Sequence, residues 1–395
     1  MPGRGDRETW WRGERERLLG LIEGDGALYV YHLPTVAARA RSLRTRLASI
    51  GGFYYSMKAN PHPRILETVV GEGFGIECVS AAEVARVREL FGEAPSVLFT
   101  PNFCPVGEYA SAFTAGAEVT IDGPHLLDQA PDLFREREIA LRVDPGSGLG
   151  HHHKVRTAGA HAKFGHPIGD VAEVAVAAAR VGVTVVGLHA HIGSGIREPR
   201  VWAETGAALV SVRDVFPGLR WIDVGGGLGI VDRPGEAPLD LGQLANGLAR
   251  LHARCGDLEL RIEPGRFVVG EAGVLLAPVT QVRNKGGVRF VGLATGMNSL
   301  IRPSLYGAWH GIHNLSRLDA PAAGSAHVVG PICETGDVLG HDRPLPETAP
   351  GDIFLIENCG AYGAVMSSRY NLRSPAGEHV LPPGDGYKKA VLGTA

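Results

Sequence analysis

The sequence has little cysteine for its 395 residues, and its cysteines do not form a pattern. There are five of them, an odd number, and no two have the CxxC spacing of a metal or redox motif: Cys78, Cys104, Cys255, Cys333 and Cys359. We therefore expect neither a disulfide framework nor a structural zinc, and we expect a reducing, cytoplasmic location. Most of these cysteines should be small buried side chains.

Long apolar runs and an excess of charge are also missing. No run approaches the roughly 18 apolar residues that a membrane-spanning helix needs. The N-terminus, MPGRGDRETWWRGERERLL, is charged and lacks the apolar segment of a secretory signal. The formal net charge is -3 and no long basic block occurs. We therefore expect no nucleic-acid partner and no membrane partner.

A regular alternation of strands and helices fills the first two thirds of the chain. Helical periodicity marks the segments between several strands, such as 81–90, 171–182 and 241–255. About eight parallel strands predict a (β/α)8 barrel of the TIM type, with a doubly wound open sheet as the alternative. The expected strands are Phe53–Lys58, Phe74–Cys78, Ser96–Phe99, Glu118–Ile121, Ile139–Val143, Thr184–Ala190, Trp221–Val224 and Leu258–Glu263.

The two ends of the chain predict a second domain. A strand-like run precedes the alternation, and β-rich runs with Gly and Pro punctuation follow it: 27–33, 274–284, 288–295, 326–333, 352–360 and 378–382. A chain of this length usually forms more than one core. We expect the barrel over residues 36–265 and a β-sheet or β-barrel domain built from residues 1–35 and 266–395.

Chemically distinctive residues gather where the predicted barrel strands end. Lys58 ends the first strand, His191 follows the sixth, a triple glycine at 225–227 follows the seventh, and Glu263 and Arg266 end the eighth. In a parallel barrel this face carries the active site, because the loops converge over the strand ends. The four motifs together therefore predict one site.

Lys58 and Glu263 have the chemistry of a site that holds an aldehyde cofactor. A lysine in apolar surroundings becomes a usable amine nucleophile, as Schiff-base chemistry requires; the alternative is a surface lysine. A buried carboxylate such as Glu263 needs a partner. A protonated pyridine nitrogen would be one, and a salt bridge to Arg266 or another arginine is the alternative.

The glycines and histidines allow several interpretations. The GGGLG segment does not start a GxGxxG pattern, so dinucleotide binding is disfavoured. Its bare backbone N–H groups can bind a phosphate, and a simple tight turn is the alternative. His191 can stack on a flat ring, whereas the run at 151–153 is expected in a solvated loop. No histidine spacing matches a metal motif, so no metal is expected.

Six segments appear in order over nearly the whole chain: YYSMKAN, HAHIGSG, DVGGGLG, EPGR, GPICETGD and GAYGAVMSSRYN. With them the chain resembles the fold-type-III pyridoxal-phosphate (PLP) decarboxylases, the family of ornithine, lysine, arginine and diaminopimelate decarboxylases. Among these it is most similar to the diaminopimelate decarboxylases. The resemblance implies a PLP-dependent carboxy-lyase of lysine biosynthesis that converts meso-2,6-diaminopimelate to L-lysine and carbon dioxide.

The resemblance also implies roles for individual residues. Lys58 would bind PLP covalently, and Cys333, supplied by the neighbouring subunit of a homodimer, would protonate the product carbon. The other cofactor-binding residues would be His191, Ser194, Gly226, Gly227, Glu263, Pro264, Gly265, Arg266 and Tyr362. The substrate would be bound by Arg266, Arg302, Tyr306, Glu334 and Tyr362. Without the resemblance, Cys333 is a buried core cysteine and Arg302 an exposed loop arginine.

Charge favours diaminopimelate as the substrate. Its distal carboxylate and ammonium suit Arg302 and Glu334, and a smaller diamine acid would leave the arginines unpaired. Three residues depart from the family pattern: Glu77, Thr335 and Arg369. Of these, Thr335 and Arg369, together with the short C-terminal tail, keep another substrate open, namely lysine, ornithine, carboxynorspermidine or an amino acid of specialised metabolism. A PLP-binding carrier or regulator is the non-enzymatic alternative.

Overall fold

The computed structural model describes residues 9–24, 26–146, 159 and 162–382. These residues form two compact units. The barrel unit comprises residues 37–231 and 237–268, and the β-unit comprises residues up to 36, 232–236 and the described chain from 269 on. The domain limits predicted from the sequence, 36–265 for the barrel and 1–35 with 266–395 for the β-domain, remain predictions. The short segment 232–236 was expected in the barrel and groups with the β-unit.

The barrel unit contains a closed ring of eight parallel strands. Pairing of β5 with β6 closes the ring, so the expected barrel is confirmed and the open-sheet alternative is wrong. The strands are β2 (Gly52–Ser56), β3 (Gly75–Cys78), β4 (Val97–Phe99), β5 (Glu118–Ile121), β6 (Glu138–Asp144), β8 (Thr184–His189), β9 (Trp221–Asp223) and β10 (Glu259–Ile262). A two-residue strand, β7 (His166–Pro167), pairs with β6 beside the ring.

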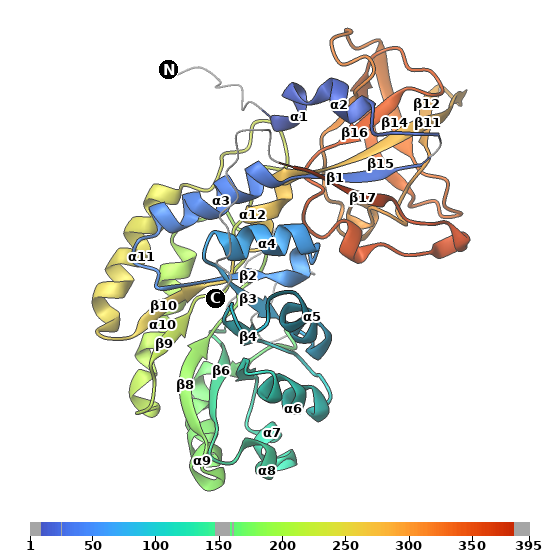
Figure 1. Ribbon diagram of the computed structural model, residues 1–395. Coiled ribbons are helices and arrows are strands. Elements are labelled where there is room, and N and C mark those ends of the chain that lie inside the picture. Colours follow the sequence, from blue (N-terminus) through green and yellow to red (C-terminus); the bar gives the residue numbers. More distant parts are fainter. Residues whose placement is uncertain (1–8, 25, 147–158, 160–161, 383–395) are drawn as a thin grey trace. The chain divides into compact units, whose positions relative to one another are not determined.

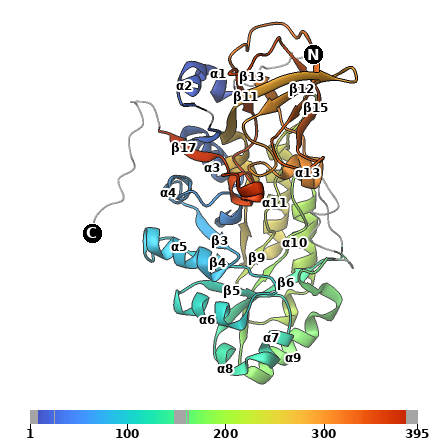
Figure 2. The ribbon, with the colours of Figure 1, turned by 90° about the vertical axis from the view of Figure 1, so that its right-hand side faces the viewer.

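Helices follow most strands and lie on the outer side of the ring, as Figure 2 shows for α5 and α6 beside β3 to β5. Polar caps start some of them: the Ser80 hydroxyl accepts from the Glu83 backbone N–H at α5, and Asp240 caps α11. The helices are α3 (Leu33–Arg46), α4 (Pro63–Gly71), α5 (Ala81–Phe91), α6 (Val106–Thr114), α7 (His125–Gln129), α8 (Pro131–Phe134), α9 (Val171–Val181), α10 (Val201–Ser211), α11 (Leu241–Cys255) and α12 (Arg266–Val269).

The β-unit is a mixed sheet built from both ends of the chain, as Figure 1 shows by the blue β1 beside the red β17. Its strands are β1 (Leu28–His32), β11 (Gly273–Lys285), β12 (Val288–Leu293), β13 (Ile312–Asn314), β14 (Gly324–Val329), β15 (Val338–Leu345), β16 (Ile353–Ile356) and β17 (Gly377–Leu381). β1 pairs with β11 and β17, and the main order is β13-β16-β11-β12-β14-β15. The helices α1 (Trp10–Gly13), α2 (Arg15–Leu19) and α13 (Arg302–Tyr306) complete it.

Apolar side chains from the two chain ends share one core in the β-unit. Trp11 and Leu18 pack with Val30, Leu276 and Leu355. Because the N-terminal helices bury their apolar side on the C-terminal strands, the β-unit needs both ends of the chain to fold. No helix within the described ranges has the length and apolar character to cross a membrane.

Inside the barrel, an aromatic layer fills the end where the strands begin. Trp221 opens β9 and packs with Tyr54, Leu98 and Ala140. Its indole lies against Gly187 of β8, where a Cβ atom would stand 2.2 Å from the ring. Glycine at this position therefore makes room for the indole, since interiors are close-packed.

We predict that Gly187→Ala lowers the stability of the barrel by about 1–3 kcal/mol, because the added methyl group overpacks the indole layer. Gly71→Ala is the matched control, since a Cβ on Gly71 meets no atom within 4 Å. Thermal unfolding followed by circular dichroism measures both variants. Equal midpoints for Gly187→Ala and the wild type would contradict this packing.

Candidate active site

Lys58 stands at the mouth of the barrel, in a short 3-10 turn (Met57–Ala59) after β2. Its Nζ lies 2.7 Å and 2.6 Å from the two carboxylate oxygens of Glu77 on β3. Glu77 is fully buried and also accepts a hydrogen bond from the Thr100 hydroxyl. The expectation of apolar surroundings for Lys58 is therefore wrong. A buried carboxylate orients the amine instead, and the ion pair offsets the cost of burying Glu77.

Glu263 and two further polar groups form a buried cluster at the ends of β8, β9 and β10. Glu263 Oε2 lies 3.2 Å from Nε2 of His189, and both side chains are buried. Asp223 is buried beside them and accepts a hydrogen bond of 2.7 Å from the Gly225 N–H. The alternative predicted for Glu263 was a salt bridge to an arginine. The structure instead gives it His189 as its hydrogen-bond partner.

The two carboxyl groups of this cluster have opposite protonation tendencies. Burial raises the pKa of Asp223 well above its usual range, and the charge of Glu263 raises it further. Burial alone would also raise the pKa of Glu263, but His189 and Lys58 outweigh it and lower the pKa. The opposite directions favour the ionised form of Glu263, whose Oε2 has His189 Nε2 as its hydrogen-bond partner.

One oxygen of Glu263 is left for a ligand. Within the described ranges no donor reaches Glu263 Oε1, although the atom is buried. His189, Asp223 and Glu263 also have the residue types of a metal site, with ligand atoms within 4.8 Å of one another. Leaving a buried carboxylate oxygen unmet is costly, so the cluster is built for a partner. A protonated ring nitrogen satisfies it directly.

His191 lies next to the glycine turn as a neutral imidazole. Its Nδ1 accepts a hydrogen bond of 3.1 Å from the Gly226 N–H. Burial lowers the pKa of His191 to about 3, and the positive charges of Arg142 and Lys58 lower it as well. A neutral, flat imidazole fixed through Nδ1 is suited to stacking on a cofactor ring.

The triple-glycine turn brings two backbone segments too close for side chains. Gly225 and Gly227 have φ angles of 71° and 89°, a region that glycine adopts without strain. A Cβ on Gly226 would stand 2.0 Å from the Glu263 carbonyl oxygen, and one on Gly227 2.2 Å from the Gly193 carbonyl oxygen. The turn therefore has structural reasons to be glycine, and it also exposes the bare backbone that a phosphate needs.

The EPGR segment joins this turn to the lysine. The Ser56 hydroxyl donates to the Glu263 carbonyl at 3.0 Å, the Ser56 N–H donates to the Pro264 carbonyl at 3.3 Å, and Gly265 packs against Ser56. Arg266 reaches across to Ser194, with 3.2 Å between Nη2 and Oγ. The structure thus brings together all the predicted residues of the barrel rim: Lys58, His191, Ser194, Gly226, Gly227, Glu263, Pro264, Gly265 and Arg266.

The remaining predicted residues belong to the β-unit. Arg302 is buried, with its Nη1 3.1 Å from His310 Nε2, so the alternative of an exposed loop arginine is wrong. Cys333 is exposed, so a buried core cysteine is also wrong. Cys78, Cys255 and Cys359 are buried as expected, and Cys104 is partly exposed. Tyr306 ends α13, and Tyr362 has a φ angle of 56°.

Two hydrogen bonds hold the segment that carries Cys333 and Glu334. The Cys333 N–H donates to Asn371 Oδ1 at 2.8 Å, and the Tyr370 hydroxyl donates to Glu334 Oε1 at 2.7 Å. Thr335 and Arg369, which depart from the family pattern, are both exposed. The histidines at 151–153 lie outside the described residues.

Sequence reasoning missed three members of the barrel cluster. His189 and Asp223 were not singled out, and Glu77 was noted only as a departure from the family pattern. Each sits in an otherwise apolar strand and is buried. A charged residue within a buried strand is the signal that finds them, because such a residue needs a partner.

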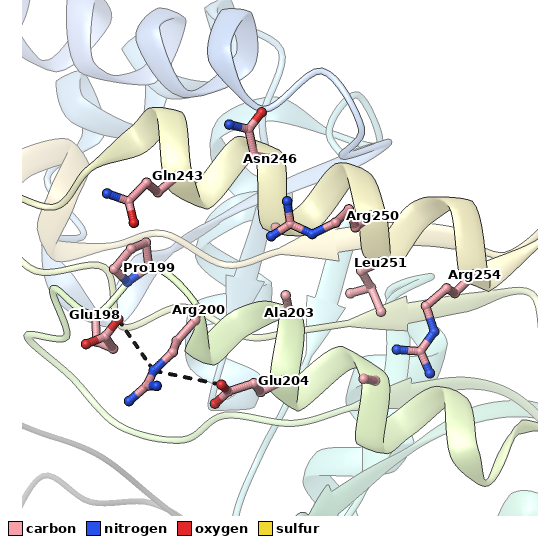
Figure 3. A pocket seen from close by; sticks show the side chains of 12 residues that line it. Glu198, Pro199, Arg200, Ala203, Glu204, Gln243, Asn246, Arg250, Leu251 and Arg254 are labelled. Atoms are coloured by element: carbon pink, nitrogen blue, oxygen red, sulfur yellow. Dashed lines mark ion pairs between the residues drawn. The ribbon is translucent and has the colours of Figure 1, made fainter.

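A cavity of about 590 Å³ is a groove between α10 and α11 that contains none of the predicted site residues. Figure 3 shows Arg200 between Glu198 and Glu204, with Nε–Oε1 distances of 3.6 Å and 3.8 Å. Arg250 and Arg254 line the other wall and are exposed. The groove is thus an open surface feature, whereas the acidic groups at the barrel mouth, Glu77, Asp223 and Glu263, are buried.

The barrel residues fit PLP. Glu263 Oε1 can accept a hydrogen bond from the ring nitrogen, Lys58 offers an amine, and the glycine turn with Arg266 offers N–H donors to a phosphate. A planar group of this size also suits the flat face of His191. The strongest part of this fit is the buried Glu263 Oε1, which no donor reaches within the described ranges.

Comparison with known proteins agrees with this fit. Residues 33–270 match the family model of the pyridoxal-dependent decarboxylases, pyridoxal binding domain. A diaminopimelate decarboxylase of Archaeoglobus fulgidus is 36% identical over 350 residues, covering 85% of this chain and 82% of the relative. One of Methanothermobacter thermautotrophicus is 34% identical over 344 residues, covering 84% and 80%.

Solved structures show the same fold. The diaminopimelate decarboxylase of Helicobacter pylori complexed with L-lysine superposes with a TM-score of 0.84 at 27% identity, covering 93% of this chain and 94% of that chain. A lysine decarboxylase of Selenomonas ruminantium reaches 0.83 at 22% identity, covering 93% and 95%, which speaks for the fold alone. The chain therefore belongs to the pyridoxal-dependent decarboxylases, carboxy-lyases that use PLP.

Proposed function

We propose that the protein removes carbon dioxide from meso-2,6-diaminopimelate and yields L-lysine. The observation that carries the substrate is the identity of 34–36% to relatives named diaminopimelate decarboxylase, over more than four fifths of the chain. The likeness to a diaminopimelate decarboxylase complexed with L-lysine supports it. The buried Arg302 supplies the cation that a distal carboxylate requires.

PLP is held by the residues of the barrel mouth. Lys58 binds it covalently, with Glu77 orienting the amine. Glu263 Oε1 would accept a hydrogen bond from the ring nitrogen, while His189 Nε2 lies at hydrogen-bond distance from Oε2. When bound, PLP supplies a conjugated ring that accepts the electron pair left on carbon as carbon dioxide departs. An ionised Glu263 keeps the ring nitrogen protonated, which maximises that capacity.

The phosphate is held away from the reacting carbon. Bare backbone at Gly227, the Ser194 hydroxyl and the Arg266 guanidinium would be the donors, whereas the Gly226 N–H already donates to His191 Nδ1. Charge-assisted hydrogen bonds from arginine are among the strongest that proteins make. They would hold the cofactor beside the flat face of the His191 imidazole.

The segment around Cys333 completes the site in a homodimer, in which it acts in the site of the partner subunit. The exposure of Cys333 and Glu334 supports this role, since both side chains are available to a second chain. Cys333 Sγ gives the proton that replaces the carboxylate, and Glu334 receives the distal ammonium of the substrate. Tyr370 and Asn371 position this segment through their hydrogen bonds.

The substrate is tested with a panel of meso-diaminopimelate, L-lysine, L-ornithine and carboxynorspermidine on PLP-loaded protein, with carbon dioxide detection. We expect kcat/KM for meso-diaminopimelate to exceed the others by about 10⁴-fold, because a ligand that lacks the distal carboxylate cannot form an ion pair with Arg302. Faster turnover of another member would assign a different decarboxylase. Cofactor absorbance with no carbon dioxide release from any member would favour a carrier.

Lys58→Ala is expected to abolish the visible absorbance of the covalently bound cofactor and to stop turnover. The amine that Glu77 orients is lost with this change, and with it the nucleophile that binds the cofactor. Lys163→Ala is the matched control, because Lys163 is an exposed lysine of the same unit. Absorbance retained in Lys58→Ala but lost in the control would move the attachment point to Lys163.

Glu263→Gln is expected to bind PLP but to reduce kcat by about 10²–10³-fold, because a neutral amide cannot keep the ring nitrogen protonated. Asp223→Asn is the matched control from the same cluster. Burial raises the pKa of its carboxyl group, and the amide keeps an oxygen that can accept from the Gly225 N–H, so this change should alter kcat little. Steady-state kinetics at saturating PLP measures both. Equal losses in the two variants would show that Glu263 has no distinct role.

A further inference from the structure

The β-unit contains a cavity whose lining includes none of the residues to which a role was assigned above. Its volume is about 430 Å³. Apolar groups form part of the wall, including Pro303, Leu339 and the Trp309 indole, and no acidic residue lines it. Arg233, His341 and Arg343 are its basic residues. The lining therefore has a positive charge without a matching negative one.

Arg343 is the central feature of this cavity. It is 9% exposed, and its Nε is buried with no hydrogen-bond partner among the residues described. No described carboxylate forms an ion pair with its guanidinium, which instead stacks on Trp309 with 4.3 Å between Cζ and the ring centroid. Burial lowers the pKa of Arg343, and the neighbouring charge of Arg233 lowers it further. A cation in this state is costly unless an anion joins it.

An irregular backbone, with a positive φ angle at Asp342 and a β-bulge, precedes Arg343. Asp342 has a φ angle of 49°, and β15 pairs with β14 through an irregular register, from Val328↔Gly340 to Ala326↔Arg343. The chain advances three residues on β15, from Gly340 to Arg343, while it advances two on β14, from Ala326 to Val328. The extra residue is a β-bulge. The bulge turns Arg343 toward Gly340, where a Cβ would stand 2.5 Å from Nε. The glycine and the bulge together make room for the flat guanidinium.

We propose that this cavity binds a small oxyanion, a carboxylate or a phosphate, between Arg343 and Arg233. Arg343 offers the planar donor edge that such anions accept, and Trp309 holds that edge in place. The exposed Arg233 adds a second cation at the rim, on the segment 232–236. Pockets of this volume are common for small ligands.

The cavity is not part of the proposed active site, but its lining adjoins two segments that carry proposed substrate-binding residues. Ser304 and Gly307 of its lining belong to the segment of Arg302 and Tyr306, and Thr335 follows Glu334. The Ser304 hydroxyl donates to the Gly336 carbonyl, which ties the two segments together across the cavity. An anion bound here contacts both segments.

Isothermal titration calorimetry of the PLP-loaded protein with sodium phosphate, and separately with sodium acetate, tests the proposal. At least one anion is expected to bind saturably with one site per chain, and Arg343→Gln is expected to weaken it at least tenfold. Arg233→Gln, a change of an exposed residue, should weaken the same binding severalfold. Arg283→Gln, an exposed arginine outside the cavity, is the matched control and should bind as the wild type does.

Three results would overturn the proposal. They are absence of saturable binding of either anion to the wild type, unchanged binding in both Arg233→Gln and Arg343→Gln, and equal weakening in the Arg283→Gln control. Sedimentation of the same variants separates a free anion from a carboxylate of the partner subunit. If Arg233→Gln weakens the dimer, the cavity binds a carboxylate of the partner subunit. This fourth result would also overturn the proposal. Arg233→Gln keeps the test valid if Arg343→Gln does not fold.

Discussion

The bond between Glu263 and His189 is the interaction on which the barrel site depends. Both groups are buried, and 3.2 Å separates Glu263 Oε2 from His189 Nε2. Without His189, burial would favour a protonated Glu263, and a neutral acid would compete for the proton of a ring nitrogen instead of stabilising it. With His189, the carboxylate stays charged and presents Oε1 to a ligand. The electron-accepting power of the cofactor therefore depends on an imidazole that does not need to touch it.

The order of the strands explains how these groups meet. Around the ring, β3, β2, β10, β9 and β8 are consecutive neighbours. At their carboxyl ends they carry, in the same order, Glu77, Lys58, Glu263, Asp223 and His189. An ion pair joins the first two of these residues and a hydrogen bond joins the third and fifth. Parallel neighbours end at the same face, so one topological feature gathers charges that are distant in the sequence.

Much of this arrangement was predictable from the sequence, because buried parallel strands consist of short runs of apolar residues. The expected strand Glu118–Ile121 and the helix 241–255 match β5 and α11 residue for residue. β15 was missed because Asp342, Arg343 and Pro344 interrupt its apolar pattern, and the bulge that accommodates them is a tertiary feature. β13 is too short to give a pattern. Glu77 and His189 were missed for another reason: what a buried charge pairs with is decided by neighbours in space.

The central claim is that an ionised Glu263 holds the ring nitrogen of PLP protonated. Nitrogen-15 NMR of the protein loaded with PLP that is labelled at the ring nitrogen measures this protonation state directly. The account predicts the chemical shift of a protonated pyridine across the pH range in which the protein is folded. A shift typical of an unprotonated ring nitrogen at neutral pH would contradict it.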